Sequence, residues 1–507
     1  MWVGLQQRDL RIIAHYTGML LASLALGMLV PLATALVAGE WDPALDYAAG
    51  AGVAAAVGML LATRAPRGSY LTRRNALLVT AMAWISASLV AAVPLSLSGH
   101  YAGFLDALFD AMSGLTTSGL TLAQDLDHMA LAHNMWRHLL HLIGGQGIIV
   151  AALSVALGLR GGGAVSLYIA EGRDERIMPN VIHTARFIWF VTFVWVTLGT
   201  TILGVSNLLH GMEFGRAVLH GFWATVACYD TGGFGPQSQN ALYYHSPVFE
   251  SVTVILMLAG TLNFNLHADL WRGDTKEIFK NIEARALAVN IAILSVAVGL
   301  GLGATTAFSS AGEVLRKGVY HIVSANSGTG HQTLYPAQWS GDFGGLGIAA
   351  IMLAMAFGGM ASSTAGGIKA LRLGLIVKGV LVRIRQALAP QTAIVAERYH
   401  HLVDVTLSAD VLANALMIFV LYVVTYISGG VIGAAYGYPA GEALFESISA
   451  TANVGLSTGI TSPAMPAGLK IVYIVQMWAG RLEFIALFAL VASVVASIRS
   501  RRTRGRA

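Results

Sequence analysis

Long apolar runs dominate the chain and alternate with short polar stretches. Runs such as 12–37, 77–97, 187–203 and 411–427 have the length of a transmembrane helix, which needs about 17 to 25 mostly apolar residues. Short segments of alternating polarity, the mark of a transmembrane β-barrel, do not occur in the pattern. The pattern therefore predicts an all-α polytopic membrane protein with about ten transmembrane helices.

The charge distribution agrees with this class and suggests an orientation. Charged residues make up 11% of the chain, against about 25% in soluble domains. Basic residues gather near the N-terminus and in segments 64–74, 160–186, 272–285, 369–398 and 499–506. By the positive-inside rule, these segments and both termini are expected on the cytoplasmic side of a plasma membrane. The basic tail also suits contact with membrane lipid, so no nucleic-acid partner is expected.

The basic segments divide the chain into five units. Residues 1–63 have the pattern of a simple helical hairpin. Each of the other four units contains an apolar run, a short amphipathic stretch, a glycine-rich polar stretch and a second apolar run. These four repeats are residues 64–165, 166–275, 276–395 and 396–507. Each repeat is expected to enter and leave on the cytoplasmic side, with its middle facing outside or dipping back into the membrane.

The four glycine-rich stretches align in one frame without gaps. They read FDAMSGLTTSGLT, WATVACYDTGGFG, YHIVSANSGTGHQ and FESISATANVGLS. Each begins with an aromatic residue, has a small residue four positions later, and has a glycine six positions after that. Because residues four apart share a helix face, we expect a short helix that ends just before the glycine stretch. The glycines in this frame are Gly119, Gly233, Gly330 and Gly455.

Four such segments can meet around one axis and form an ion filter. Non-helical backbone at membrane depth is tolerated where protein surrounds it or water contacts it. Glycine permits backbone angles that other residues avoid, so carbonyl oxygens can turn inward and replace the hydration shell of a cation. The alternative is four ordinary extracellular hairpins, in which glycine, serine and threonine are also common.

At these residues the chain resembles the Trk/Ktr/HKT superfamily of potassium transporters, most closely the bacterial Trk-type potassium uptake membrane subunit. The four loops carry the resemblance, together with the stretches that follow them: WRHLLHLIGGQGIIV, GTLNFNLHADLWRG, FGGMASSTAGGIKALR and QMWAGRLEF. The resemblance implies four repeats around one pore, with one glycine of each loop in a potassium filter. His331 and Asp230 depart from the family's pattern. The N-terminal hairpin favours the Trk branch over the shorter Ktr branch.

The resemblance also implies site residues and partners. The transported ion would be K⁺, with no cofactor bound by this chain. The family implies a homodimer in the bacterial inner membrane and a separate cytosolic nucleotide-binding regulatory ring of the RCK/KTN type. The implied ion-binding residues are Thr117, Ser118, Gly119, Thr231, Gly232, Gly233, Gly328, Thr329, Gly330, Asn453, Val454 and Gly455.

A second glycine-rich segment, AFGGMASSTAGGIK at 356–369, interrupts an apolar run of the third repeat. Each glycine weakens a helix by roughly 1 kcal/mol relative to alanine, so the run should break into a loop within the membrane. The segment lacks the ending of a phosphate-binding P-loop, which excludes nucleotide binding there. The resemblance implies a gate in this segment, with Gly358, Gly359, Gly366, Gly367 and Lys369 as its residues. Lys369, at the cytoplasmic end, is expected to anchor the loop at the membrane interface and not to line the pore. The alternative is helix packing through small residues.

Arg481 lies near the centre of the last apolar run, 468–496. A charge at that depth is costly and usually faces a pore or pairs with a partner. Glu483, two residues away, points to another face of the helix and is a poor partner. We therefore expect a gating role in which Arg481 holds the loop or tunes ion occupancy. The alternative is a structural salt bridge to another helix.

Other polar residues point to no enzymatic chemistry. No nucleophile–base set or metal-binding pattern stands out, and Cys228 is the single cysteine, so we expect no enzyme. His400 and His401 are expected to be solvated in a cytoplasmic loop. A cation-coupled secondary transporter with a midplane site remains the alternative, although such folds usually show two-fold repeats. Nine acids are expected to make the outer mouth negative: Asp106, Asp110, Asp125, Asp127, Glu213, Glu250, Glu313, Glu442 and Glu446.

Overall fold

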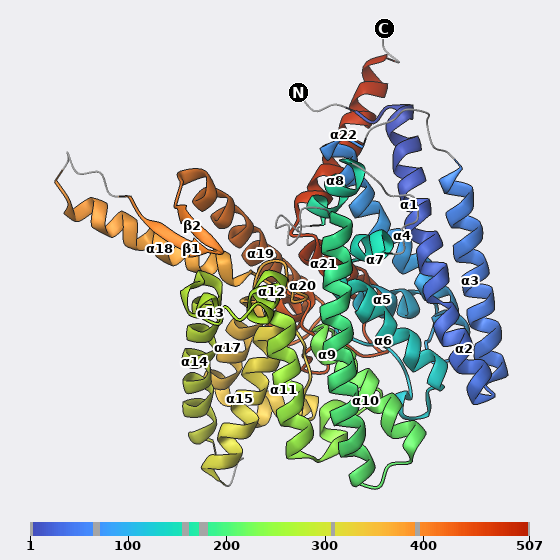
Figure 1. The fold of residues 1–507 in the computed structure, drawn as a ribbon, viewed down its shortest axis with the longest axis horizontal. Helices are drawn as coiled ribbons and strands as arrows, with labels where there is room; N and C mark the ends of the chain where they lie inside the picture. Colours follow the sequence, from blue (N-terminus) through green and yellow to red (C-terminus); the bar gives the residue numbers. More distant parts are fainter. Residues whose placement is uncertain are drawn as a thin grey trace. The chain divides into compact units, whose positions relative to one another are not determined.

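The structure, a computed structural model, describes residues 4–63, 71–154, 162–171, 181–305, 310–390 and 396–504. Parts of the basic segments at 64–74, 160–186, 369–398 and 499–506 lie outside the described residues. Within the described ranges the chain is mostly helical (Figure 1).

Six spans of the described chain are long and apolar enough to cross a membrane. They are α1–α2 (Gln7–Ala38), α3 (Trp41–Ala62), α4 (Arg73–Leu97), α9 (Val181–Leu209), α14 (Ile282–Gly303) and α19 (Ala409–Ala435). Two bent pairs also qualify, each as one broken span. The prediction of an all-α polytopic membrane protein is confirmed.

The second helix of each repeat is broken, which is why fewer than ten straight spans are found. In the second repeat, α11 (Pro247–Thr261) and α12 (Phe264–Trp271) meet at 104°. In the fourth, a break at residues 482–484 separates α21 (Ala467–Arg481) from α22 (Ile485–Arg504). The first repeat is interrupted at Gly147, between α6 (Leu131–Gln146) and α7 (Ile148–Ser154). The third has a 13-residue loop between α17 (Gly344–Ala356) and α18 (Ala370–Leu388).

The chain forms two compact units. The first contains residues 1–116, 121–192 and 481–507. It holds α1 to α8, including α5 (Phe104–Leu115), η1 (Leu126–His128) and α8 (Gly162–Ala170), together with the start of α9 and α22. Helices α1 and α3 pack closely, because a methyl group at Gly58 would come within 2.8 Å of the Ala22 backbone nitrogen. Small residues allow this close approach between membrane helices.

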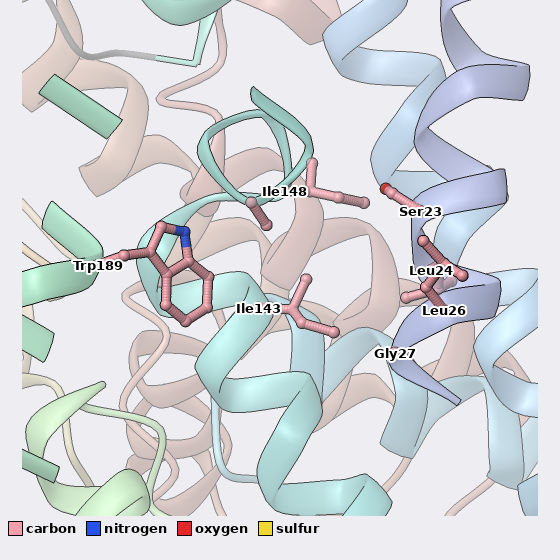
Figure 2. A pocket seen from close by; sticks show the side chains of 8 residues that line it. Ser23, Leu24, Leu26, Gly27, Ile143, Ile148 and Trp189 are labelled. Carbon is pink, nitrogen blue, oxygen red and sulfur yellow. The ribbon is translucent and has the colours of Figure 1, made fainter. Parts of the chain in front are cut away.

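The first unit also contains an apolar cavity of about 400 Å³ (Figure 2). Leu24 and Gly27 of α1, Ile143 of α6, Ile148 of α7 and Trp189 of α9 line it. Ile143 and Ile148 flank the Gly147 break, so the cavity lies beside the interruption in the second span of the first repeat.

The second unit contains residues 117–120 and 193–480. Besides the spans given above, it holds three short helices that precede the glycine stretches: α10 (Phe214–Tyr229), α15 (Ala311–Ser327) and α20 (Ala440–Thr451). The remaining elements are η2 (Asn240–Tyr244), α13 (Lys276–Lys280), α16 (Pro336–Asp342), β1 (Arg398–His401) and β2 (Val403–Thr406). The two strands form an antiparallel hairpin that lies along α18 (Figure 1).

His400 attaches the β-hairpin to α13. A solvated side chain is expected here from the sequence, and that expectation is wrong for His400. Its Nδ1 lies 2.7 Å from an Asp404 carboxylate oxygen, and its Nε2 lies 2.9 Å from Glu277. Two carboxylates on one ring favour the doubly protonated imidazolium. Hydrogen bonds from Asp404 and then Glu277 accordingly raise the pKa of His400 above its usual value of 6.5.

Docking of the hairpin is therefore expected to depend on pH. A histidine whose pKa is raised on folding stabilises the docked form fully below about pH 6.5, and the contribution is lost as pH rises through the raised value. Hydrogen exchange of the hairpin amides, corrected for intrinsic exchange, should show more protection at pH 6 than at pH 9. His400→Gln should remove this difference. A difference that persists in His400→Gln would assign it to another group.

Candidate functional site

The four predicted glycine stretches follow four short helices, α5, α10, α15 and α20. The aromatic residue of the shared frame is buried in each helix: Phe109, Trp223, Tyr320 and Phe445. Each helix ends three or four residues before the frame glycine. The helices therefore deliver four loops of equivalent length, here called the triplets: residues 117–119, 231–233, 328–330 and 453–455.

The triplets share an unusual backbone. The first and last residue of each has a positive φ, a conformation that is rare for residues other than glycine. The φ values are 54° and 75° in the first triplet, 52° and 79° in the second, 74° and 73° in the third, and 56° and 98° in the fourth. Because Thr117, Thr231 and Asn453 adopt this conformation without being glycine, the backbone geometry is held by the surrounding structure.

The triplets form a closed ring in chain order. A methyl group added to Gly119 would come within 2.6 Å of the Gly232 carbonyl oxygen, in the next triplet. The same substitution at each other frame glycine would press on the middle carbonyl of its neighbour: Gly233 on Thr329, Gly330 on Val454, and Gly455 on Ser118. All twelve residues belong to the second unit, so the structure brings the predicted ion-binding residues together in one place.

A side-chain acceptor braces three of the four loops. In the shared frame, the residue directly after the aromatic accepts a hydrogen bond from a backbone N–H. That N–H belongs to the residue three positions after the last glycine of the triplet. The pairs are Asp110 with Leu122 at 2.7 Å, His321 with Thr333 at 3.1 Å, and Glu446 with Thr458 at 2.9 Å. His321 can accept through Nε2 because its Nδ1 donates to the Lys317 carbonyl.

The second repeat lacks both partners of this bond. Alanine (Ala224) stands at the acceptor position, and proline (Pro236), which has no N–H, stands at the donor position. Asn240 takes over part of the role, donating to the Gly233 carbonyl at 3.1 Å. Sequence reasoning missed this brace, although the paired loss of acceptor and donor in one repeat is visible in the aligned loops.

Burial corrects the expectation that all nine acids charge the outer mouth. Asp110 and Glu446 are fully buried, and Asp106 is 3% exposed. Asp110 lies 3.5 Å from the buried Arg137 guanidinium, and Glu250 lies 2.5 Å from Arg316. Acids that hold backbone amides or cations inside the fold present no free charge to an approaching ion. Sequence position alone could not separate them from solvated acids such as Asp125, whose side chain is 60% exposed.

The two departures from the family's pattern are both buried. Asp230 caps the C-terminal end of α10 with no exposed surface, which excludes a solvated acid at the mouth. His331 is 2% exposed, and its Nδ1 lies 3.3 Å from the Cys228 sulfur on α10. His331 therefore packs against the second repeat's short helix.

The segment predicted to interrupt the third repeat is a loop at 357–369, here called the intramembrane loop. Its ends are tied together, since Gly358 donates to the Ile368 carbonyl at 2.9 Å and Ala370 donates to Gly359 at 3.0 Å. A side chain on Gly358 would overlap the Gly366 carbonyl, so the glycine pairs allow the two arms to approach.

The tip of the intramembrane loop lies at the start of the triplets. The Thr364 hydroxyl lies 3.1 Å from the Tyr229 carbonyl, which precedes the second triplet, and 2.9 Å from Gly260. The Thr231 hydroxyl lies 3.3 Å from that of Thr364. A methyl group on Gly366 would overlap the Ala452 carbonyl, just before the fourth triplet. The loop thus contacts one end of the ring.

The two basic residues of the predicted gate have different environments. The Lys369 ammonium contacts the Ala365 carbonyl inside the intramembrane loop. Arg481, in the first unit, donates to the Gly144 carbonyl at 2.5 Å and lies 5.7 Å from the Trp84 ring. Gly144 is in the last turn of α6, where carbonyl groups carry partial negative charge and favour a cation.

Comparison with known proteins places these features in a family. The TrkH family, described as a cation transport protein, matches residues 47–500. An uncharacterized cation transporter of Methanocaldococcus jannaschii is 29% identical over 493 residues, covering 97% of each chain. The Trk system potassium uptake protein TrkH of Halomonas elongata is 29% identical over 508 residues, covering 95% of this chain and 98% of its own.

A solved structure shares the fold. The potassium transporter TrkH from Vibrio parahaemolyticus matches with a TM-score of 0.80 at 23% identity, covering 95% of this chain and 98% of that one. Because the family match spans most of the sequence and the fold agrees over nearly all of it, this chain belongs to the TrkH family of cation transport proteins, which are transporters and not enzymes.

Proposed function

We propose that this chain is the potassium-conducting transmembrane subunit of a Trk-type uptake system, with the ring of four triplets as its selectivity filter. The observation that carries the proposal is the closed ring, in which each frame glycine lies against the middle carbonyl of the next triplet. Relatives named as potassium uptake proteins support K⁺ as the ion.

The ring suits K⁺ because carbonyl oxygens can replace the water around the ion. The left-handed glycine at the end of each triplet has no side chain to fill the space between neighbouring loops. The braces from Asp110, His321 and Glu446 hold the chain beyond three of the triplets and limit widening of the ring. Conduction then needs neither a cofactor bound by this chain nor a chemical step.

The intramembrane loop serves as the gate in this proposal. It contacts the second and fourth triplets or the residues before them through Thr364 and Gly366. A methyl group on Gly328, which begins the third triplet, would come within 3.3 Å of the Gly366 nitrogen. An ion leaving that end of the ring would therefore meet the loop. Gly358, Gly359, Gly366 and Gly367 let the loop fold back on itself, and Lys369 closes its base. Arg481, held by carbonyl groups at the end of α6, adds a positive charge at a broken span.

The wider assembly follows from the family resemblance. The chain would lie in the bacterial inner membrane with both termini in the cytoplasm. It would form a homodimer and work with a separate cytosolic nucleotide-binding ring of the RCK/KTN type, since its own glycine-rich segments lack a nucleotide-binding motif.

Ion flux into liposomes containing the purified protein tests this function. We expect K⁺ uptake down its gradient that exceeds Na⁺ uptake and needs no proton gradient. Uptake that requires Na⁺ or a proton gradient would instead establish a coupled transporter. Equal uptake of K⁺ and Na⁺ would contradict a potassium filter.

A further inference from the structure

A buried carboxylate holds the intramembrane loop from outside. Glu283 lies in the first turn of α14 and has no exposed surface. Its Oε1 accepts the backbone N–H of Ala361 at 2.7 Å, in the middle of the intramembrane loop. Hydrogen bonds to a charged acceptor are stronger than those between neutral groups, so this contact fixes the loop more firmly than a carbonyl would.

The other oxygen of the same carboxylate faces the β-hairpin. The His401 Nδ1 lies 3.6 Å from Glu283 Oε2, and His401 ends strand β1. The neighbouring His400 bonds to Glu277 on α13, which precedes α14 in the chain. The hairpin is therefore seated on the α13–α14 segment through two adjacent histidines, one of which faces the carboxylate that holds the loop.

These contacts connect three segments that are distant in sequence. Residues 398–406, 283 and 361 all belong to the second unit. Removing the hairpin from its seat would take the His401 ring away from Glu283 Oε2 and change the surroundings of the carboxylate that accepts the Ala361 N–H. A weaker bond to the Ala361 N–H would hold the loop less strongly.

We infer that Glu283 is a positioning residue that holds the intramembrane loop in its blocking position, and that the β-hairpin controls this hold through His401. The inference rests on the proposed function, in which the loop is the gate. Energetic coupling between separate sites usually changes an equilibrium by about 5- to 150-fold. Movement of the hairpin relative to α14 would change the fraction of molecules with an open gate through the contact between His401 and Glu283.

The first test measures K⁺ flux in liposomes for Glu283→Ala, Glu283→Gln and His401→Ala. Glu283→Ala should raise basal flux by about fivefold or more, the lower end of typical coupling. Glu283→Gln keeps an oxygen acceptor for Ala361 and should stay nearer to wild type. The effect of His401→Ala should vanish in the Glu283→Ala background, because both act through one contact. Val403→Ala, on the exposed hairpin surface, is the matched control and should behave as wild type.

A second readout separates positioning from a general loss of structure. Hydrogen exchange at Ala361 should accelerate in Glu283→Ala and remain slow in Glu283→Gln, while the K⁺ over Na⁺ preference stays at the wild-type value in both. Unchanged exchange at Ala361 in Glu283→Ala would overturn the inference, as would additive effects of the two substitutions. If Glu283→Ala does not fold, His401→Ala carries the test: basal flux and exchange at Ala361 that both match wild type would overturn the inference.

Deleting 358–367 distinguishes the two proposals. If that deletion conducts freely while Glu283→Ala matches wild type, the inference about Glu283 fails and the proposed function stands. If neither the wild type nor the deletion conducts K⁺, the proposed function itself fails.

Discussion

Gly119→Ser is expected to lower the preference for K⁺ over Na⁺ by about tenfold or more, which corresponds to about 1.4 kcal/mol. The added atom would come within 2.6 Å of the Gly232 carbonyl oxygen, and that oxygen must move. The φ of 75° adds strain, because a left-handed backbone costs about 1–2 kcal/mol for a residue with a side chain. A ring with one displaced carbonyl no longer matches the ion's hydration shell. Competitive K⁺ and Na⁺ uptake into liposomes measures the change.

Gly437→Ser is the matched control for this experiment. Gly437 also has a positive φ, 94°, but no atom lies within 4 Å of the position that its side chain would take. It therefore carries the backbone strain without the contact, and wild-type selectivity is expected. Selectivity that is unchanged by serine at each of the four frame glycines would show that the ring is not the filter.

Deleting most of the intramembrane loop, residues 358–367, is expected to raise basal K⁺ flux by about tenfold, since a gate that is removed cannot close. Gly366→Leu should have the opposite effect. Its side chain would stand against the Ala452 carbonyl and Asn453, where the fourth triplet begins, and would fill the end of the ring. Basal flux into liposomes without any regulatory partner measures both changes.

Gly345→Leu controls for added bulk, because Gly345 on α17 has no neighbouring atom within 4 Å of its side-chain position. It should leave flux unchanged. A similar loss of flux in the deletion and in Gly366→Leu, with both proteins folded, would assign the loop a packing role and remove it from the gating mechanism.

The fold was largely predictable because apolar length and glycine spacing are properties of the sequence itself. Runs such as 411–427 lie within long helices, here α19, and one frame located all four triplets. The break at 356–369 was predictable from helix propensity, because its four glycines cannot sustain a membrane helix. These features can be predicted without knowing which distant segments contact one another.

Contacts that depend on the path of a loop were not predictable. The hydrogen bond that the Leu122 N–H donates to Asp110 crosses a non-helical turn, so no periodic rule pairs these residues. Glu446 was expected to add negative charge at the outer mouth, but it is buried and accepts the backbone N–H of Thr458. The Gly144 carbonyl that Arg481 contacts and the Glu277 carboxylate beside His400 lie in segments far away in the sequence. In each case the sequence pointed to the residue as unusual but could not identify the residue that it contacts.

The ring of triplets comes from a single polypeptide, and this bears on how such a protein can vary during evolution. In a ring built from four identical subunits, one codon change alters all four sides at once. Here the quarters already differ: proline and alanine replace the brace only in the second repeat, and a histidine serves as acceptor only in the third. Each quarter can accumulate its own substitutions while the other three preserve the geometry. In the proposed filter, ion preference could therefore change in small, independently heritable increments.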